Sequence, residues 1–141
     1  MSEYIDLEIQ KWAERLAHGT LSEVADALVF YKQFRKKLAQ EPQLLGLMGY
    51  WKEAMVKSLR NPHVSPAYME EIIQILVTDF SEVEVNGELI TYFEKITLPQ
   101  QVELLHALQT NVSEKFSDVI LQLEETIANT PKKFKTFNLK H

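Results

Sequence analysis

The chain has 141 residues, no cysteine, 45% apolar and 25% charged residues, and a net charge of −5. This length and composition are typical of one soluble globular domain, and the lack of cysteine excludes disulfides, zinc–thiolate sites, iron–sulfur clusters and cysteine nucleophiles. We expect a cytoplasmic protein, because the N-terminal residues are acidic and no apolar run approaches the ~18 residues of a membrane span.

Two helices are predicted in the first part of the chain. Apolar residues at helical spacing indicate a helix over 2–17, and Gly19 just beyond it is a typical helix stop. Thr20 and Glu23 have the spacing of a capping box, in which each side chain bonds the backbone N–H of the other residue. A second helix is therefore expected over 20–40.

A third helix is predicted from Pro42 to Asn61, where a second proline follows. Gly46 and Gly49 lie beside its apolar stripe, and a glycine inside a helix costs about 1 kcal/mol relative to alanine. These two glycines favour a close crossing with another helix.

The segment 65–80 has the widest apolar surface in the chain. On a helix its apolar residues cover roughly 200° of the circumference, about twice the stripe that a surface helix needs. Ser65 as N-cap marks the start of this helix. We predict that it is the central helix, with Ile72, Leu76 and Phe80 on its inner face.

The segment 83–91 is compatible with two structures. With a period of two, Asn86-Gly87 would be the turn of a small β-hairpin. With a period of 3.6, the apolar residues from Leu89 onward form one face of a short helix after the Asn-Gly break. We prefer the helix, because an isolated hairpin has little to pack against in a helical chain.

Two more helices follow. Thr97 and Gln100 form a second capping box, and an apolar stripe that starts at Phe116 predicts a last helix ending at Thr130-Pro131. The chain is thus predicted to be all-α, with about six to seven helices in antiparallel pairs. Since each stretch of about 41 to 45 residues holds two helices, the pairs form either a compact bundle or a short stack like that of helical-repeat proteins.

The charge is unevenly distributed along the chain. Residues 65–130 contain two lysines and twelve acidic residues, a net charge of −10, whereas residues 131–141 contain four lysines and no acidic residue. We call residues 65–130 the acidic half. It attracts a basic protein and repels phosphate and anionic lipid, so we expect neither nucleic acid nor a membrane as partner.

We expect residues 1–130 to form one helical domain and residues 131–141 an ordered, docked tail. Burying a phenylalanine contributes roughly 1.5–3 kcal/mol, whereas an exposed ion pair contributes about 0–1 kcal/mol. We therefore expect the two phenylalanines of the tail to anchor it on the chain's own helices or on a second copy in a homodimer. We expect the lysines of the tail to determine where on that surface it docks.

Few residues suggest chemistry. Glu103 and His106 have the Glu-x-x-His spacing of di-iron helices, but such sites need two copies of this element. Arg60 and His63 have side chains suited to phosphate chemistry, yet the adjacent prolines explain the segment as a connection between helices. No catalytic residue, metal ligand or cofactor is therefore predicted.

The predicted function is non-catalytic binding of a macromolecule, expected to be a basic protein, through an acidic helical surface. Inhibitors and immunity-type proteins that cover basic enzymes follow the same charge logic. The alternative is a small helical enzyme or ligand-binding protein with a pocket between helices, lined for instance by Tyr50, Trp51 and His106. The residues expected at the partner interface are Glu70, Glu71, Glu124, Glu125, Lys132, Lys133, Phe134 and Phe137.

Overall fold

The structure is a computed structural model that describes residues 2–111 and 114–139, with side chains described for 4–111 and 114–129. The all-α prediction is confirmed, and the described residues contain no strand. The elements are α1 (Ser2–His18), α2 (Leu21–Leu38), the 3₁₀ helix η1 (Pro42–Leu47), α3 (Met48–Ser58), α4 (Pro66–Asp79), α5 (Glu82–Lys95), α6 (Leu98–Thr110), the 3₁₀ helix η2 (Glu114–Phe116) and α7 (Ser117–Leu139).

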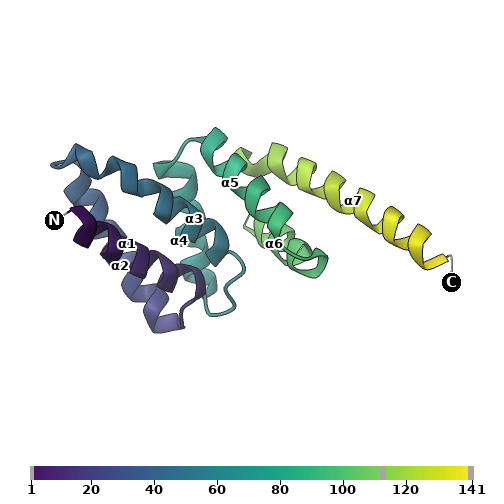
Figure 1. Cartoon of the computed structure of the whole chain (residues 1–141), viewed down its shortest axis with the longest axis horizontal. Coiled ribbons are helices and arrows are strands. Elements are labelled where there is room, and N and C mark those ends of the chain that lie inside the picture. The colour runs from purple at the N-terminus through teal and green to yellow at the C-terminus, as the bar shows by residue number, and fades with distance from the viewer. Residues whose placement is uncertain (1, 112–113, 140–141) are drawn as a thin grey trace.

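The odd-numbered helices form a row in chain order. Helix α1 packs on α3, α3 on α5, and α5 on α7, while α2 packs on α1, α4 on α3 and α5, and α6 on α7. Figure 1 shows the resulting elongated molecule, with α1 and α2 at one end and α7 at the other. This sequential packing corresponds to a short stack of helix pairs, one of the two architectures that the sequence allowed.

The centre of the stack is α3 rather than α4. Helix α3 contacts α1, α4, α5 and η1, and its Trp51 is fully buried. The prediction that 65–80 forms the central helix is therefore wrong, although Ile72 and Leu76 are fully buried as expected. The wide apolar arc of α4 does reflect neighbours on more than one side, because α4 packs on both α3 and α5.

The segment 83–91 is helical, so the hairpin alternative is excluded. Helix α5 begins earlier than predicted, because Ser81 and Glu84 form a capping box at its start. The helix then continues through Asn86-Gly87 without a break. The Ser-x-x-Glu spacing was visible in the sequence and is the signal that our prediction missed.

The two glycines near the start of the third helix do not mark a close crossing. A Cβ added at Gly46 or Gly49 would meet no atom within 4 Å, so neither position needs glycine for space. This part of the chain forms η1 before α3 begins, instead of one continuous helix. The crowded position is Gly19, where a Cβ would press against the backbone carbonyl oxygen of Arg15.

Replacing Gly19 with alanine is expected to lower the free energy of unfolding by about 1–3 kcal/mol, the usual cost of overpacking. Gly87, in the middle of α5, is the matched control because a Cβ there meets no atom within 4 Å. Gly87→Ala is expected to stabilise the protein by roughly 0.5–1 kcal/mol. Urea denaturation of both variants measures the difference, and equal effects would contradict the close approach at Gly19.

The last helix does not end at Thr130-Pro131 as predicted, since α7 continues to Leu139. A proline inside a helix removes one backbone donor at a cost of about 3 kcal/mol, but the residues after it can keep helical geometry. The structure does not describe the side chains of residues 130–141. The predicted docking of the tail depends on these side chains and therefore stays a prediction. None of the described helices combines the length and apolar character of a membrane span.

Candidate interaction surface

A hollow of about 430 Å³ lies along the outer face of α4. We call it the α4 hollow. Its lining residues recur every three or four positions, so they form one stripe of the helix with an apolar part in the middle and carboxylates towards both ends. They are Ala67, Glu70, Glu71, Gln74, Ile75, Thr78 and Asp79.

Two carboxylates of the α4 hollow are bound by the neighbouring helix α2. Glu71 forms an ion pair with Lys32, and the Asp79 carboxylate lies 3.4 Å from Nε of Arg35. Tyr31 of α2 also donates a hydrogen bond to Asp79 Oδ2 at 2.7 Å. These bonds hold α2 on α4, so both carboxylates have a structural role at the edge of the hollow.

The environment of Tyr31 keeps its hydroxyl protonated. Burial raises the pKa of the phenol, and the hydrogen bond to the Asp79 carboxylate raises it further. The hydroxyl is therefore neutral at physiological pH and can donate its hydrogen bond to Asp79.

The predicted partner residues Glu70 and Glu71 do not have the same surroundings. Glu70 is exposed, and among the described residues it has no ion pair. Glu71 is partly buried beside Lys32. A partner in the α4 hollow therefore meets Glu70 as the free carboxylate.

The predicted pair Glu124 and Glu125 lies on α7, in a different part of the stack from α4 (Figure 1). Both residues are exposed, and Glu124 also accepts a hydrogen bond from Nε2 of Gln109 at 3.1 Å. The structure thus does not bring the two predicted pairs together. Lys132, Lys133, Phe134 and Phe137 lie outside the described side chains.

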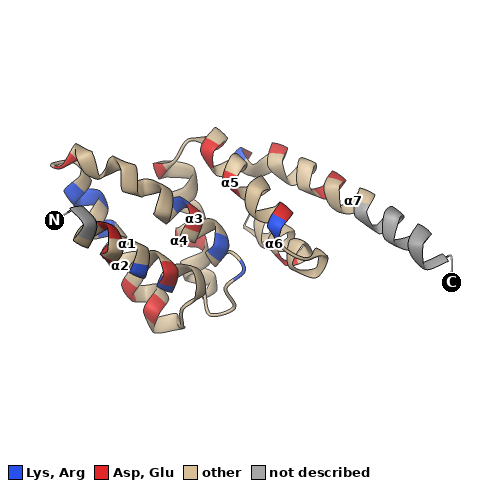
Figure 2. Ribbon diagram, viewed as in Figure 1, with Lys and Arg blue, Asp and Glu red and all other residues tan. Residues whose placement is uncertain are grey.

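Most of the remaining carboxylates of the acidic half are exposed. Among the described residues this half forms ion pairs through Glu71, Asp79 and Glu103, and their partners, Lys32, Arg35 and Arg60, all belong to the first part of the chain. Figure 2 shows the other acidic residues along α5 and the first part of α7. The negative charge predicted for this half is therefore exposed over the end of the stack that contains these helices.

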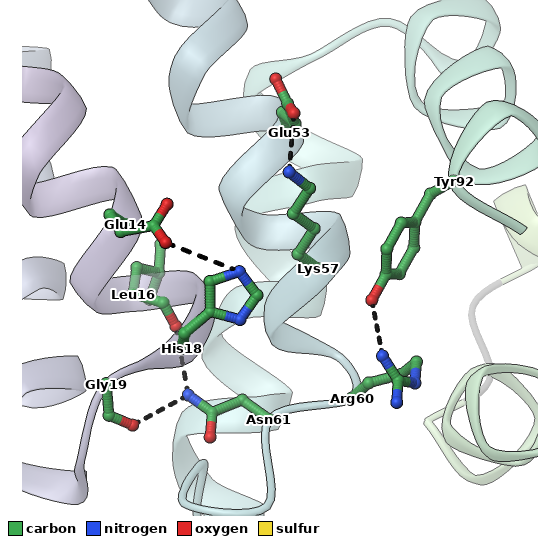
Figure 3. Close-up of polar contacts among 9 residues, drawn as sticks. All are labelled: Glu14, Leu16, His18, Gly19, Glu53, Lys57, Arg60, Asn61 and Tyr92. Carbon is green, nitrogen blue, oxygen red and sulfur yellow. Dashed lines mark hydrogen bonds and ion pairs between the residues drawn. The ribbon is translucent and has the colours of Figure 1, made fainter. Parts of the chain in front are cut away.

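The turn between α3 and α4 locks neighbouring helix pairs together (Figure 3). Arg60 Nη1 donates a hydrogen bond to the Tyr92 hydroxyl at 2.9 Å. Asn61, only 6% exposed, donates through Nδ2 to the carbonyl oxygen of Gly19 at 3.1 Å and faces that of Leu16 at 3.4 Å. Arg60 thus connects the turn after α3 to α5, and Asn61 connects the same turn to the end of α1.

Cationic side chains line a polar hollow of about 290 Å³ beside this turn. Lys57 donates to Glu53 at 2.8 Å, and Arg60 contacts Glu103 at 3.3 Å, so both permanent charges are already compensated. The hollow also lies at the C-terminal ends of α1 and α3, where cations complement the partial negative charge of the helix dipole. These contacts support the prediction that the Arg60–His63 segment is a structural connection.

The pocket suggested for Tyr50, Trp51 and His106 does not exist. The Trp51 ring is enclosed by aromatic side chains of α2, and the nearest ring centroid, that of Tyr31, lies 5.1 Å away. Tyr50 lines a surface hollow against α1, and His106 is exposed on α6. Trp51 is thus enclosed in the core, whereas Tyr50 and His106 lie at the surface on different helices, so the three side chains do not line one cavity.

The described residues contain no group of three or more His, Asp or Glu side chains that could hold a metal ion. Comparison of the chain with protein-family models, with curated protein sequences and with solved structures finds no match.

Proposed function

We propose that the protein is a non-catalytic interaction module that binds a basic segment of another protein in the α4 hollow. The observation that carries this proposal is an apolar floor, Ile75, with the carboxylates of Glu70 and Glu71 on one side of it and that of Asp79 on the other, in a hollow of about 430 Å³. Glu71 and Asp79 are paired with α2, and Glu70 has no ion pair among the described residues. A peptide or helix with one or two apolar side chains and flanking lysines or arginines fits this chemistry.

Charge and apolar contact have different roles in this proposal. The net charge of −10 on residues 65–130 attracts a basic protein from a distance and speeds association. The apolar floor supplies the contact that slows dissociation once the segment is seated. Stacks of helix pairs offer extended surfaces of this kind. The cytoplasm, expected from the composition, is the compartment that we propose for this interaction.

Reversing charge in the α4 hollow is expected to weaken partner binding about tenfold or more, equivalent to ~1.4 kcal/mol. The double variant Glu70→Lys/Gln74→Lys places two cations on exposed lining positions. The control Asp26→Lys/Gln43→Lys makes the same change of charge at exposed positions in the first part of the chain. Proteins captured from the native host by the wild-type chain are identified, and their binding is measured with all three proteins.

The proposal requires a basic captured protein whose binding is lost in the hollow variant, is retained in the control, and weakens steeply as salt concentration rises. Binding that is equal in both variants would place the interface elsewhere. An affinity that does not change with salt would contradict the acidic surface as the source of attraction.

A further inference from the structure

The polar hollow of about 290 Å³ beside the α3–α4 turn differs in charge from the rest of this acidic chain. We call it the turn hollow. Half of its lining residues are of basic types, and none is acidic. They are His18, Lys57, Arg60 and His63, together with Ala17, Asn61, Pro62 and Tyr92. The turn hollow is therefore suited to an anion rather than to a cation.

The permanent cations of the turn hollow supply little net attraction by themselves. Lys57 is paired with Glu53 and Arg60 with Glu103, although neither carboxylate belongs to the lining of the hollow. The C-terminal ends of α1 and α3 add partial negative charge. Net attraction for an anion therefore depends on the two histidines.

The rings of both histidines are exposed and make no hydrogen bond to another described residue. His18 Nε2 lies 3.9 Å from a carboxylate oxygen of Glu14, which is beyond hydrogen-bond distance. His63 is fixed through its backbone N–H, which donates to Oδ1 of Asn61 at 2.9 Å. Histidine is the side chain that gains a positive charge as the pH falls from about 8 to 5. Protonation of both rings thus adds two positive charges that no carboxylate has bound.

Two further side chains of the turn hollow have donor protons to spare. Lys57 has three N–H groups and donates one to Glu53 at 2.8 Å. The Tyr92 hydroxyl accepts the hydrogen bond from Arg60, so its own proton is available to another acceptor. These donors come from α3 and α5, and His18 comes from the end of α1 (Figure 3). Donors on several elements suit a tetrahedral oxyanion, which accepts from several directions, better than a planar carboxylate.

We propose that the turn hollow binds a small tetrahedral oxyanion, a phosphate group, when His18 and His63 are protonated. The ammonium group of Lys57 and the hydroxyl of Tyr92 donate to its oxygens, and Arg60 positions that hydroxyl. A nucleic-acid strand is not the expected ligand, because the acidic half repels a polyanion. The turn hollow shares no lining residue with the α4 hollow, so this inference does not depend on the proposed function.

Sulfate is the probe for the histidines, because it remains a dianion between about pH 5.5 and 8, the range in which histidine titrates. In a titration followed by NMR at constant ionic strength, sulfate should shift the amide signals of residues 57–63 and of Tyr92. Its affinity should be about tenfold higher or more at the lower pH. Sulfate should also move the titration of both histidine rings towards higher pH, the reciprocal effect that linkage requires.

The variant His18→Gln/His63→Gln should lose this pH dependence and should bind sulfate about tenfold more weakly at the lower pH. His106→Gln changes an exposed histidine outside the hollow and should bind like the wild type. The inference would be overturned if sulfate shifted none of these signals, or if the double variant bound it as tightly as the wild type. An equal loss of affinity in His106→Gln would also overturn it, because the effect would then be one of overall charge.

Three more anions define the ligand at the lower pH. Tighter binding of phosphoserine than of inorganic phosphate would identify a phosphate monoester as the source of the group, and the reverse order would identify free phosphate. Acetate should bind much more weakly than sulfate. Acetate binding as tight as that of sulfate would contradict a site for a tetrahedral anion.

Discussion

Replacing Trp51 with alanine is expected to lower the free energy of unfolding by about 3–5 kcal/mol, the range for large aromatic residues in a core. Trp51 is fully buried, and the ring centroids of Phe30, Tyr31 and Phe34 lie 6.0, 5.1 and 6.1 Å from its own. Because α3 contacts α1, α4 and α5, the cavity would open where successive helix pairs meet. Urea denaturation followed by circular dichroism measures the loss.

Two further variants, Trp12→Ala and Trp51→Phe, show whether the loss of stability comes from the buried position of Trp51 or from removing any indole ring. Trp12 is partly exposed, stacks on Phe30 at 5.3 Å and lies under the Arg15 guanidinium at 4.6 Å, so Trp12→Ala is expected to cost less than Trp51→Ala. Among the described residues Trp51 Nε1 is buried without a hydrogen-bond partner. Trp51→Phe therefore loses no hydrogen bond and should cost much less than alanine. A Trp51→Ala loss no larger than that of Trp12→Ala would contradict the central position of α3.

Capping boxes predicted two helix starts correctly. The capping boxes of Thr20 with Glu23 and of Thr97 with Gln100 are both present, because each depends only on residues three positions apart. The helical state of 83–91 was also predicted correctly, from the absence of a packing surface for a hairpin. Local patterns therefore indicated several helix starts, although the start of α5 was missed and the predicted start at Pro42 is that of η1 rather than α3.

The order of burial among the helices was less predictable. A wide apolar arc shows that a helix has several neighbours, but it does not show whether the helix lies at the centre of the stack. The arc of α4 faces α3 and α5, while its remaining stripe lines the α4 hollow. The amphipathic pattern of α3 gave no indication that Trp51 would be enclosed by three rings of α2.

For the candidate site, too, the local pattern was predictable and the contacts between distant residues were not. The charge of the acidic half could be counted in the sequence, and this singled out Glu70 and Glu71. Which of the two stays free depends on Lys32, a residue 39 positions before Glu71 that reaches it only after α2 packs against α4. The bond between Arg60 and Tyr92 likewise joins residues on different helices. Such pairs leave no signal in one sequence, because no local rule relates their positions.

Adjacent residues of α4 provide the second large expected effect. Leu76→Ala is expected to lower the free energy of unfolding by about 2–5 kcal/mol, because Leu76 is fully buried and truncation leaves a cavity. Ile75 lies about 100° around the same helix, is only partly buried, and lines the α4 hollow. Ile75→Ala is therefore expected to cost less stability than Leu76→Ala.

For partner affinity the order of the two variants should be reversed, with the larger loss in Ile75→Ala. Ile75→Ala removes the apolar floor of the α4 hollow and is expected to weaken binding of the captured partner by at least ~1 kcal/mol. Leu76→Ala, measured at a temperature where it remains folded, should bind the partner with nearly wild-type affinity, since its side chain has no exposed surface. A loss of binding that follows the loss of stability in both variants would mean that the α4 hollow contributes to folding alone. A loss of binding confined to Ile75→Ala would show that α4 supports the fold with one face and contacts a partner with the other.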